Sequence, residues 1–153
     1  MTILRIENLT YGVEDITQCS EFLDIWGLQK NGASDNSASF KTFENQHIHL
    51  RPMDDPSLPP SYEDGPTLRE VVWGVDNHAA LNEIEAELSK DRDVRKDDDG
   101  TLHSCDDRQN YLGFQIADVV KANLHEEDFN FIENIGRVNE RSWPEERVKP
   151  IRI

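Results

Sequence analysis

Two segments of this chain, 62 residues apart, follow the same order of residue types. Leu9–Asp15 reads apolar, small, aromatic, Gly, Val, acid, Asp, and Val71–Asn77 reads apolar, apolar, aromatic, Gly, Val, acid, Asn. Self-similarity at a fixed spacing is the sequence signature of a structural unit that is used more than once. The residues after each copy therefore decide whether the two segments open equivalent units.

Each copy is followed by an amphipathic helical pattern. After the first copy, apolar residues at helical spacing predict a helix that Asp15 caps and Gly27 ends. After the second copy, a similar apolar stripe predicts a helix between Asn77 and Lys90, with Asp76 or Asn77 as its cap. Both copies therefore predict a strand, a short turn and a helix.

Each predicted helix leads into short segments of alternating polarity that are separated by turn residues. These strands are expected at about Leu28–Lys30, Ser37–Phe43 and Gln46–Arg51 in the first half, and at about Val94–Lys96, Leu102–Cys105 and Tyr111–Ile116 in the second. Between the halves, Pro52–Pro66 holds five prolines and one glycine, which predicts an irregular connector. The unit is strand–helix–strand–strand–strand, used twice.

Composition narrows the classes of partner. The 31 acidic residues outnumber the 16 basic ones, and the net charge of -15 argues against a nucleic acid or an anionic membrane surface. The first ten residues lack the pattern of a secretory signal, and no apolar run approaches the roughly 20 residues of a membrane span. With only Cys19 and Cys105, we expect a reduced, cytoplasmic protein.

Two tandem units that each open with an apolar–x–Gly–Val–acid–Asp/Asn turn resemble the vicinal oxygen chelate superfamily. This group includes glyoxalase I, bleomycin-resistance proteins and type I extradiol dioxygenases. The resemblance covers about Ile3–Asp118. It implies an α+β fold in which two βαβββ modules, at about 3–52 and 67–118 with the connector at 53–66, form a half-open barrel with the helices outside. The inner cup of such a barrel holds a small molecule and often a divalent metal.

The end of the chain resembles a particular branch of this superfamily. Arg137–Asn139 and Val148–Ile153 are similar to the linker that precedes the second domain of two-domain extradiol-type proteins, in which the second domain carries the catalytic iron. This resemblance implies a non-catalytic N-terminal domain with a downstream second domain or a homodimer partner. Residues 119–153 are expected to form an arm or linker, anchored by Phe129, Phe131, Ile132 and Trp143.

Two other functions stay open at this point. One is a stand-alone metal-dependent lyase or dioxygenase of the same superfamily. The other is a metal-free protein of the resistance type that binds a small molecule, which could be aromatic, and the negative charge favours a cationic ligand. Whether the chain is an enzyme is therefore left undecided by its sequence.

Strand alternation divides side chains between the two faces of the sheet. The large apolar residues of the opening strands, Leu9, Tyr11 and Val13 with Val71, Trp73 and Val75, are expected to face the helices. The candidate ligand-binding residues of the cup are then Asn8, Thr10, His47, His49, Arg51, Glu70 and Gly113. In Leu102–Cys105, alternation leaves open whether Leu102 and Ser104 or His103 and Cys105 point inward.

The resemblance also implies where a metal would be held. The family places its ligands on the first and last strands of each module, at positions that correspond to Asn8, His49, Glu70 and Gly113. First-row metals need about three good ligands, and an amide and a glycine fall short of this. A metal is therefore not favoured, although Fe, Mn, Zn or Ni stays open. The candidate ligands and catalytic groups are His49 and Glu70, helped by His47 or His103. The acidic turn Asp97–Gly100 lacks the later Glu of a calcium loop and is expected to be solvated.

Overall fold

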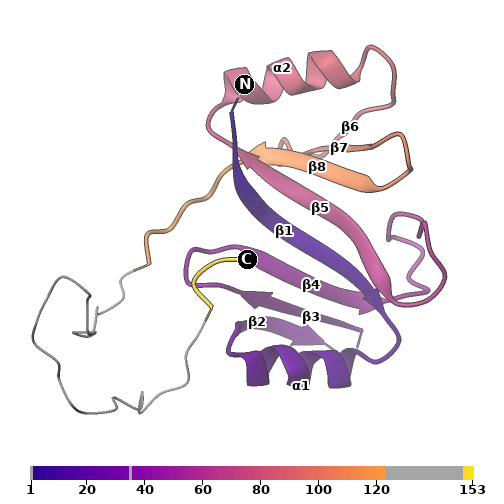
Figure 1. The fold of residues 1–153 in the computed structure, drawn as a ribbon, viewed down its shortest axis with the longest axis vertical. Helices are drawn as coiled ribbons and strands as arrows, with labels where there is room; N and C mark the ends of the chain where they lie inside the picture. The colour runs from indigo at the N-terminus through magenta and orange to yellow at the C-terminus, as the bar shows by residue number, and fades with distance from the viewer. Residues whose placement is uncertain (1, 35, 123–149) are drawn as a thin grey trace, which may run out of the picture.

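The computed structural model of the chain describes residues 2–34, 36–122 and 150–153. Two helices and an eight-stranded mixed sheet make up the fold (Figure 1). In chain order the elements are β1 (Ile3–Val13), α1 (Ile16–Trp26), β2 (Gln29–Ser34), β3 (Ser37–Lys41), β4 (His47–Pro52), β5 (Thr67–Val75), α2 (His78–Leu88), β6 (Arg95–Lys96), β7 (Leu102–Cys105) and β8 (Tyr111–Ile116). The predicted strand–helix–three-strand order is therefore present twice.

The two halves meet at the centre of the sheet. The strand order is β2-β3-β4-β1-β5-β8-β7-β6, so each half contributes four adjacent strands. The opening strands β1 and β5 pair with each other in antiparallel fashion, and each pairs in parallel with the last strand of its own half. This arrangement confirms the predicted fold class.

The helix ends follow the predicted capping. The Asp15 side chain accepts a hydrogen bond from the Gln18 backbone N–H (2.9 Å), and the Asn77 side chain accepts one from Ala80 (2.9 Å). Gly27 ends α1 with a left-handed backbone, φ 101°. These caps satisfy backbone groups that the first and last turns leave unpaired.

The core consists of two apolar clusters on the helix-bearing face of the sheet. One packs around α1 and includes Val13, Leu23, Phe40, Ile48 and Leu50, and the other packs around α2 and includes Val75, Leu81, Ile84, Leu102 and Phe114. Tyr11 packs against the first cluster and Trp73 against the second. The prediction that these two aromatic residues pack outward against the helices of their own halves is therefore confirmed.

Three register shifts interrupt the pairing of β1 with β5, and two of them place a charged residue in a bulge. Between Ile6 and Asn8 the extra residue is Glu7 on β1, and between Glu70 and Leu68 it is Arg69 on β5. Glu7 and Arg69 are themselves 62 residues apart, so they occupy equivalent positions in the repeat. Both side chains are almost fully buried, with exposed fractions of 1% and 8%.

The glycine of each repeat makes room for the charged bulge residue of the other half. A Cβ added at Gly74 would lie 2.5 Å from Glu7 Oε1, and one added at Gly12 would lie 2.8 Å from Arg69 Nε. Any larger residue would displace these side chains, since a Cβ atom does not approach another heavy atom this closely without a bond. The glycines of the repeat therefore serve the packing between halves.

Two segments fall outside these elements. Residues 53–66 join β4 to β5, and the Arg69 guanidinium donates to the backbone oxygens of Met53 (2.7 Å) and Pro59 (3.0 Å) in this connector. Residues 119–122 form neither a helix nor a strand. The predicted anchors Phe129, Phe131, Ile132 and Trp143 lie outside the described residues.

Candidate functional site

The face of the sheet opposite the helices carries the polar residues that the sequence predicts for the cup. Neighbouring strands bring them into two transverse rows, because residues paired in register point to the same side. One row runs His47, Asn8, Val72, Gly113, His103, and the next runs Ser39, His49, Thr10, Glu70, Tyr111, Cys105. The structure thus places six of the seven predicted residues side by side, and it shows that His103 and Cys105 share this face.

Arg51, the seventh predicted residue, is engaged elsewhere. It pairs in register with Gly12 at the end of β4, and its guanidinium donates to Asp55 (2.5 Å) and Ser57 (3.0 Å) in the connector. Arg51 therefore binds the connector, whereas Glu70 binds His103. The connector supplies a nearer carboxylate.

His47 and His49 stack on one another along β4. Their ring centroids are 5.8 Å apart and the planes differ by 6°. Burial lowers the pKa of both imidazoles from the usual value, and the nearby Lys41 adds to the effect at His47, while His47 and Arg51 add to it at His49. Neither ring has a hydrogen-bond partner among the described residues, so both are neutral nitrogen donors or acceptors near pH 7.

A hydroxyl group beside this pair is also unsatisfied. Ser39 lies opposite His49 in register, and its Oγ is buried with no hydrogen-bond partner in the described part of the chain. Buried polar groups without partners cost free energy unless a bound molecule or water satisfies them. This side of the cup therefore presents polar groups that are free to bond to a ligand.

On the opposite side of the cup, both ring nitrogens of His103 are hydrogen-bonded to carboxylates. His103 Nδ1 lies 2.7 Å from Glu70 Oε1, and His103 Nε2 lies 3.0 Å from Asp97 Oδ2. The hydrogen bond to Glu70 is the main cause of a raised His103 pKa, and the charges of Glu70 and Asp97 add to it. The protonated ring can donate to both carboxylates at once. Glu70 is thus committed to an internal partner.

The four positions at which the resemblance implies metal ligands, Asn8, His49, Glu70 and Gly113, do not form a ligand set in this structure. Asn8 donates to the Gln115 side chain (2.9 Å), and Glu70 bonds to His103. A Cβ built at Gly113 would lie 3.0 Å from the Leu102 backbone oxygen and 3.1 Å from Val72 Cγ2, so this position has no donor and little space. Within the described ranges, no three His, Cys, Asp or Glu residues are grouped to hold a metal ion. His49 remains alone, and these residues do not fit a tightly held metal.

Two parts of this face were missed or misread in the sequence. The turn at Asp97–Gly100 is solvated as expected, with the Asp97 side chain 39% exposed, but its hydrogen bond to His103 was missed. This bond forms because the turn folds back beside β7. Ser39 carried no signal, since a serine in an alternating strand has no distinctive spacing. His103 could have been assigned to the cup from the burial of Leu102, which the apolar core around α2 requires.

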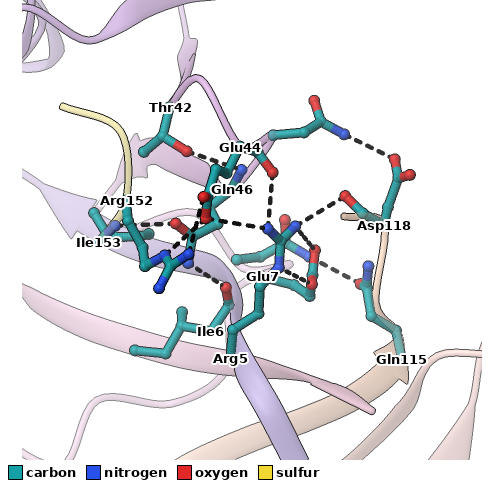
Figure 2. A network of polar contacts seen from close by, with 12 residues as sticks. Arg5, Ile6, Glu7, Thr42, Glu44, Gln46, Gln115, Asp118, Arg152 and Ile153 are labelled. Carbon is teal, nitrogen blue, oxygen red and sulfur yellow. Dashed lines mark hydrogen bonds and ion pairs between the residues drawn. The ribbon is translucent and has the colours of Figure 1, made fainter. Parts of the chain in front are cut away.

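A network of partly buried polar contacts surrounds Arg5 near the start of β1 (Figure 2). The Arg5 guanidinium grips both Glu7 carboxylate oxygens (2.5 and 3.0 Å) and donates to the backbone oxygens of Glu44 (2.8 Å) and Asp118 (2.9 Å). Bidentate pairing of this kind is specific in geometry as well as strong. It ties β1 to the loop before β4 and to the chain that leaves β8.

Comparison with known proteins supports the fold assignment. No family model and no curated protein matches the chain. Among solved structures, the Mn(II)-bound glyoxalase from Novosphingobium aromaticivorans matches with a TM-score of 0.59 and 19% identity, over 82% of this chain and 42% of that one. An extradiol ring-cleaving dioxygenase from B. fuscum matches with a TM-score of 0.62 and 16% identity, over 78% and 34%.

A third solved structure gives the same result. Homoprotocatechuate 2,3-dioxygenase from Arthrobacter globiformis matches with a TM-score of 0.61 and 15% identity, over 78% of this chain and 38% of that one. Glyoxalases and extradiol dioxygenases belong to the vicinal oxygen chelate superfamily, so the chain has the fold of that superfamily. It spans only 34–42% of the length of these three structures. No helix among the described residues combines the length and apolar character that crossing a membrane requires.

Proposed function

We propose that this chain is a non-catalytic domain of an extradiol-dioxygenase-like protein, of the type that precedes the catalytic domain. One observation carries the proposal: the position where the family places a carboxylate ligand is Gly113, and Val72 and the Leu102 carbonyl close the space around it. The neighbouring candidate ligand, Glu70, is held by His103. The chain would then work beside a second domain or a second copy, in a reducing cytoplasm that keeps Cys19 and Cys105 as the free thiols they are here.

Metal titration tests this proposal. Fe²⁺, Mn²⁺, Zn²⁺ and Ni²⁺ are titrated by calorimetry into the metal-free wild type, into His49→Ala and Glu70→Ala, and into Glu87→Ala as an exposed control on α2. We expect no stoichiometric binding at micromolar concentrations in any of the four proteins. Binding by the wild type and the control that both cup variants lose would overturn the proposal in favour of a metal-dependent enzyme.

A second candidate is a metal-free domain that binds a small aromatic molecule in the cup. The unsatisfied Ser39 Oγ and the partnerless rings of His47 and His49 favour it, because a ligand with hydroxyl groups would supply the missing hydrogen bonds. Catechol is a suitable probe, and benzyltrimethylammonium tests the preference for cations that the net charge of -15 favours. Saturable shifts of the His47 and His49 ring signals in NMR spectra would support this candidate, and unchanged signals with both probes would reject it.

A further inference from the structure

The last four residues of the chain lie against the body of the protein and are held there by backbone hydrogen bonds. The Phe43 N–H donates to the Pro150 oxygen (3.5 Å), and the Glu44 N–H donates to the Ile151 oxygen (3.2 Å). The Ile153 N–H donates to the Gln46 side-chain oxygen (3.0 Å), while the Gln46 side-chain N–H₂ donates to the backbone of Ile6 on β1 (2.6 Å). Gln46 is fully buried, so it is a fixed receptor for the backbone of this segment.

One side chain of the segment is recognised by charge. Arg152 Nε and Nη2 lie 2.7 and 2.9 Å from the two oxygens of Glu44, as Figure 2 shows. The hydrogen bond from Arg152 is the main cause of a lowered Glu44 pKa. The position of Glu44 is fixed, since its backbone oxygen accepts a hydrogen bond from the Arg5 guanidinium. A carboxylate in a fixed position that can accept from Nε and Nη2 at once favours arginine over lysine.

The neighbouring side chain, Ile153, forms part of the wall of an apolar groove. This groove has a volume of about 620 Å³ and lies between α1 and the outer face of the sheet. Ile153 is one of its lining residues and packs against the cluster around α1. The other walls are Leu9, Tyr11, Val13, Gln18, Cys19, Phe22, Leu23, Trp26, Ile48 and Leu50. In a chain with 31% charged residues, a groove with no charged side chain accepts an aliphatic or aromatic group only.

Charge supports the same pairing of segment and body. The last seven residues, 147–153, hold three basic residues and no acidic one, in a chain whose net charge is -15. The segment is therefore attracted by the rest of the molecule before any contact forms. Arg152 contacts Glu44 and Ile153 lines the groove, whereas the Ile151 side chain is 41% exposed.

We propose that the loop 42–46 and the groove beside α1 form a peptide-docking site, which binds a segment that has an arginine followed by an aliphatic residue. Its occupant is the C-terminal sequence of this chain, here supplied by the same molecule. Recognition rests on contacts rather than on chain connectivity, so a separate peptide of that sequence binds when the chain's own segment is released. This proposal is independent of the cup and of its ligand.

The test is a peptide titration followed by fluorescence anisotropy. A labelled, acetylated and amidated peptide with the sequence of residues 147–153 is added to the full-length wild type, to Ile153→Asp and to Arg152→Glu. Ile151→Asp is the matched control, since it makes the same change at an exposed position of the same segment. Thermal unfolding verifies that each variant is folded.

We expect Ile153→Asp and Arg152→Glu to bind the peptide at least about tenfold more tightly than the wild type, because a site that is mostly occupied binds a competitor in proportion to its free fraction. Ile151→Asp should behave as the wild type. A peptide carrying Asp in place of its last Ile should bind to none of them. The proposal is overturned if neither released variant binds the peptide saturably, or if all four proteins bind it equally.

Discussion

Leu9 of β1 lies directly opposite Val71 of β5, and these two residues are also equivalent in the sequence repeat. Their neighbours pair crosswise, Asn8 with Val72 and Thr10 with Glu70. A pseudo-twofold axis therefore passes between Leu9 and Val71 and relates the two halves of the sheet. The 62-residue offset of the repeat and the register of the central strands are two expressions of the same symmetry.

The glycines beside the bulges give a direct test of this symmetry. Gly74→Ala should destabilise the protein by about 3 kcal/mol, because its Cβ would displace the buried Glu7 carboxylate from Arg5. Urea denaturation measures the change. Gly32→Ala is the control, since a Cβ at Gly32 meets nothing within 4 Å. Equal stability of the two variants would show that Glu7 can move aside without cost.

Trp73 is the aromatic residue through which the second half packs on α2. Trp73→Ala should lower the free energy of unfolding by about 3 kcal/mol, at the lower end for large aromatic residues because the ring is only partly buried. Tyr11→Ala, at the equivalent position, should also be destabilising through the cluster around α1. Denaturation curves of both variants, followed by circular dichroism, check this expectation. A loss below about 1 kcal/mol in both would contradict the outward packing.

The hydrogen bonds of His103 to Glu70 and Asp97 should make the stability of the protein depend on pH. The folded pKa of His103 is raised by Glu70, so its contribution to stability is fully present below the unfolded value of about 6.5 and is lost as the pH rises through the raised folded pKa. Thermal unfolding between pH 6 and 9 should show this decline in the wild type. His103→Gln should lack it. A variant with the same decline would place its origin in another group.

His47 and His49 should titrate in the opposite sense. Burial lowers their folded pKa, so the folded state loses stability as the pH falls from about 6.5 through the lowered values. In NMR spectra their ring signals should titrate below pH 6.5 and that of His103 above it. His47→Gln, His49→Gln and His103→Gln variants assign the three signals. Titration of all three rings at one pH would contradict the expectation that the pKa is lowered at His47 and His49 and raised at His103.

Much of the fold could be predicted because it depends on local patterns. The bounds of β7 and β8 agree with the alternation in Leu102–Cys105 and Tyr111–Ile116, and the caps at Asp15 and Asn77 agree with the residue types. Gln46 was expected to open β4. It instead lies buried in the preceding loop, where its backbone oxygen accepts from the Thr42 N–H (2.9 Å), because the connection after β3 is a closed turn.

The candidate site was harder to predict because it depends on register and on contacts between distant residues. Alternation placed Asn8, His49 and Glu70 on one face, but it could not reveal that His103 would take the Glu70 carboxylate. Nor could it locate the bulges at Glu7 and Arg69, since a strict period of two has no place for an extra residue. The docking of Ile153 beside Gln46 spans 107 positions and left no local signal.

The reciprocal seating of Glu7 against Gly74 and of Arg69 against Gly12 has a consequence for how the polypeptide assembles. Each half alone would leave the hollow above its glycine open, and its bulge residue, Glu7 or Arg69, would lose the cover that the other half supplies. Cutting the chain in the connector at 53–66 should therefore yield two fragments that remain unfolded separately and regain structure when mixed, as complementing pieces of one cooperative unit.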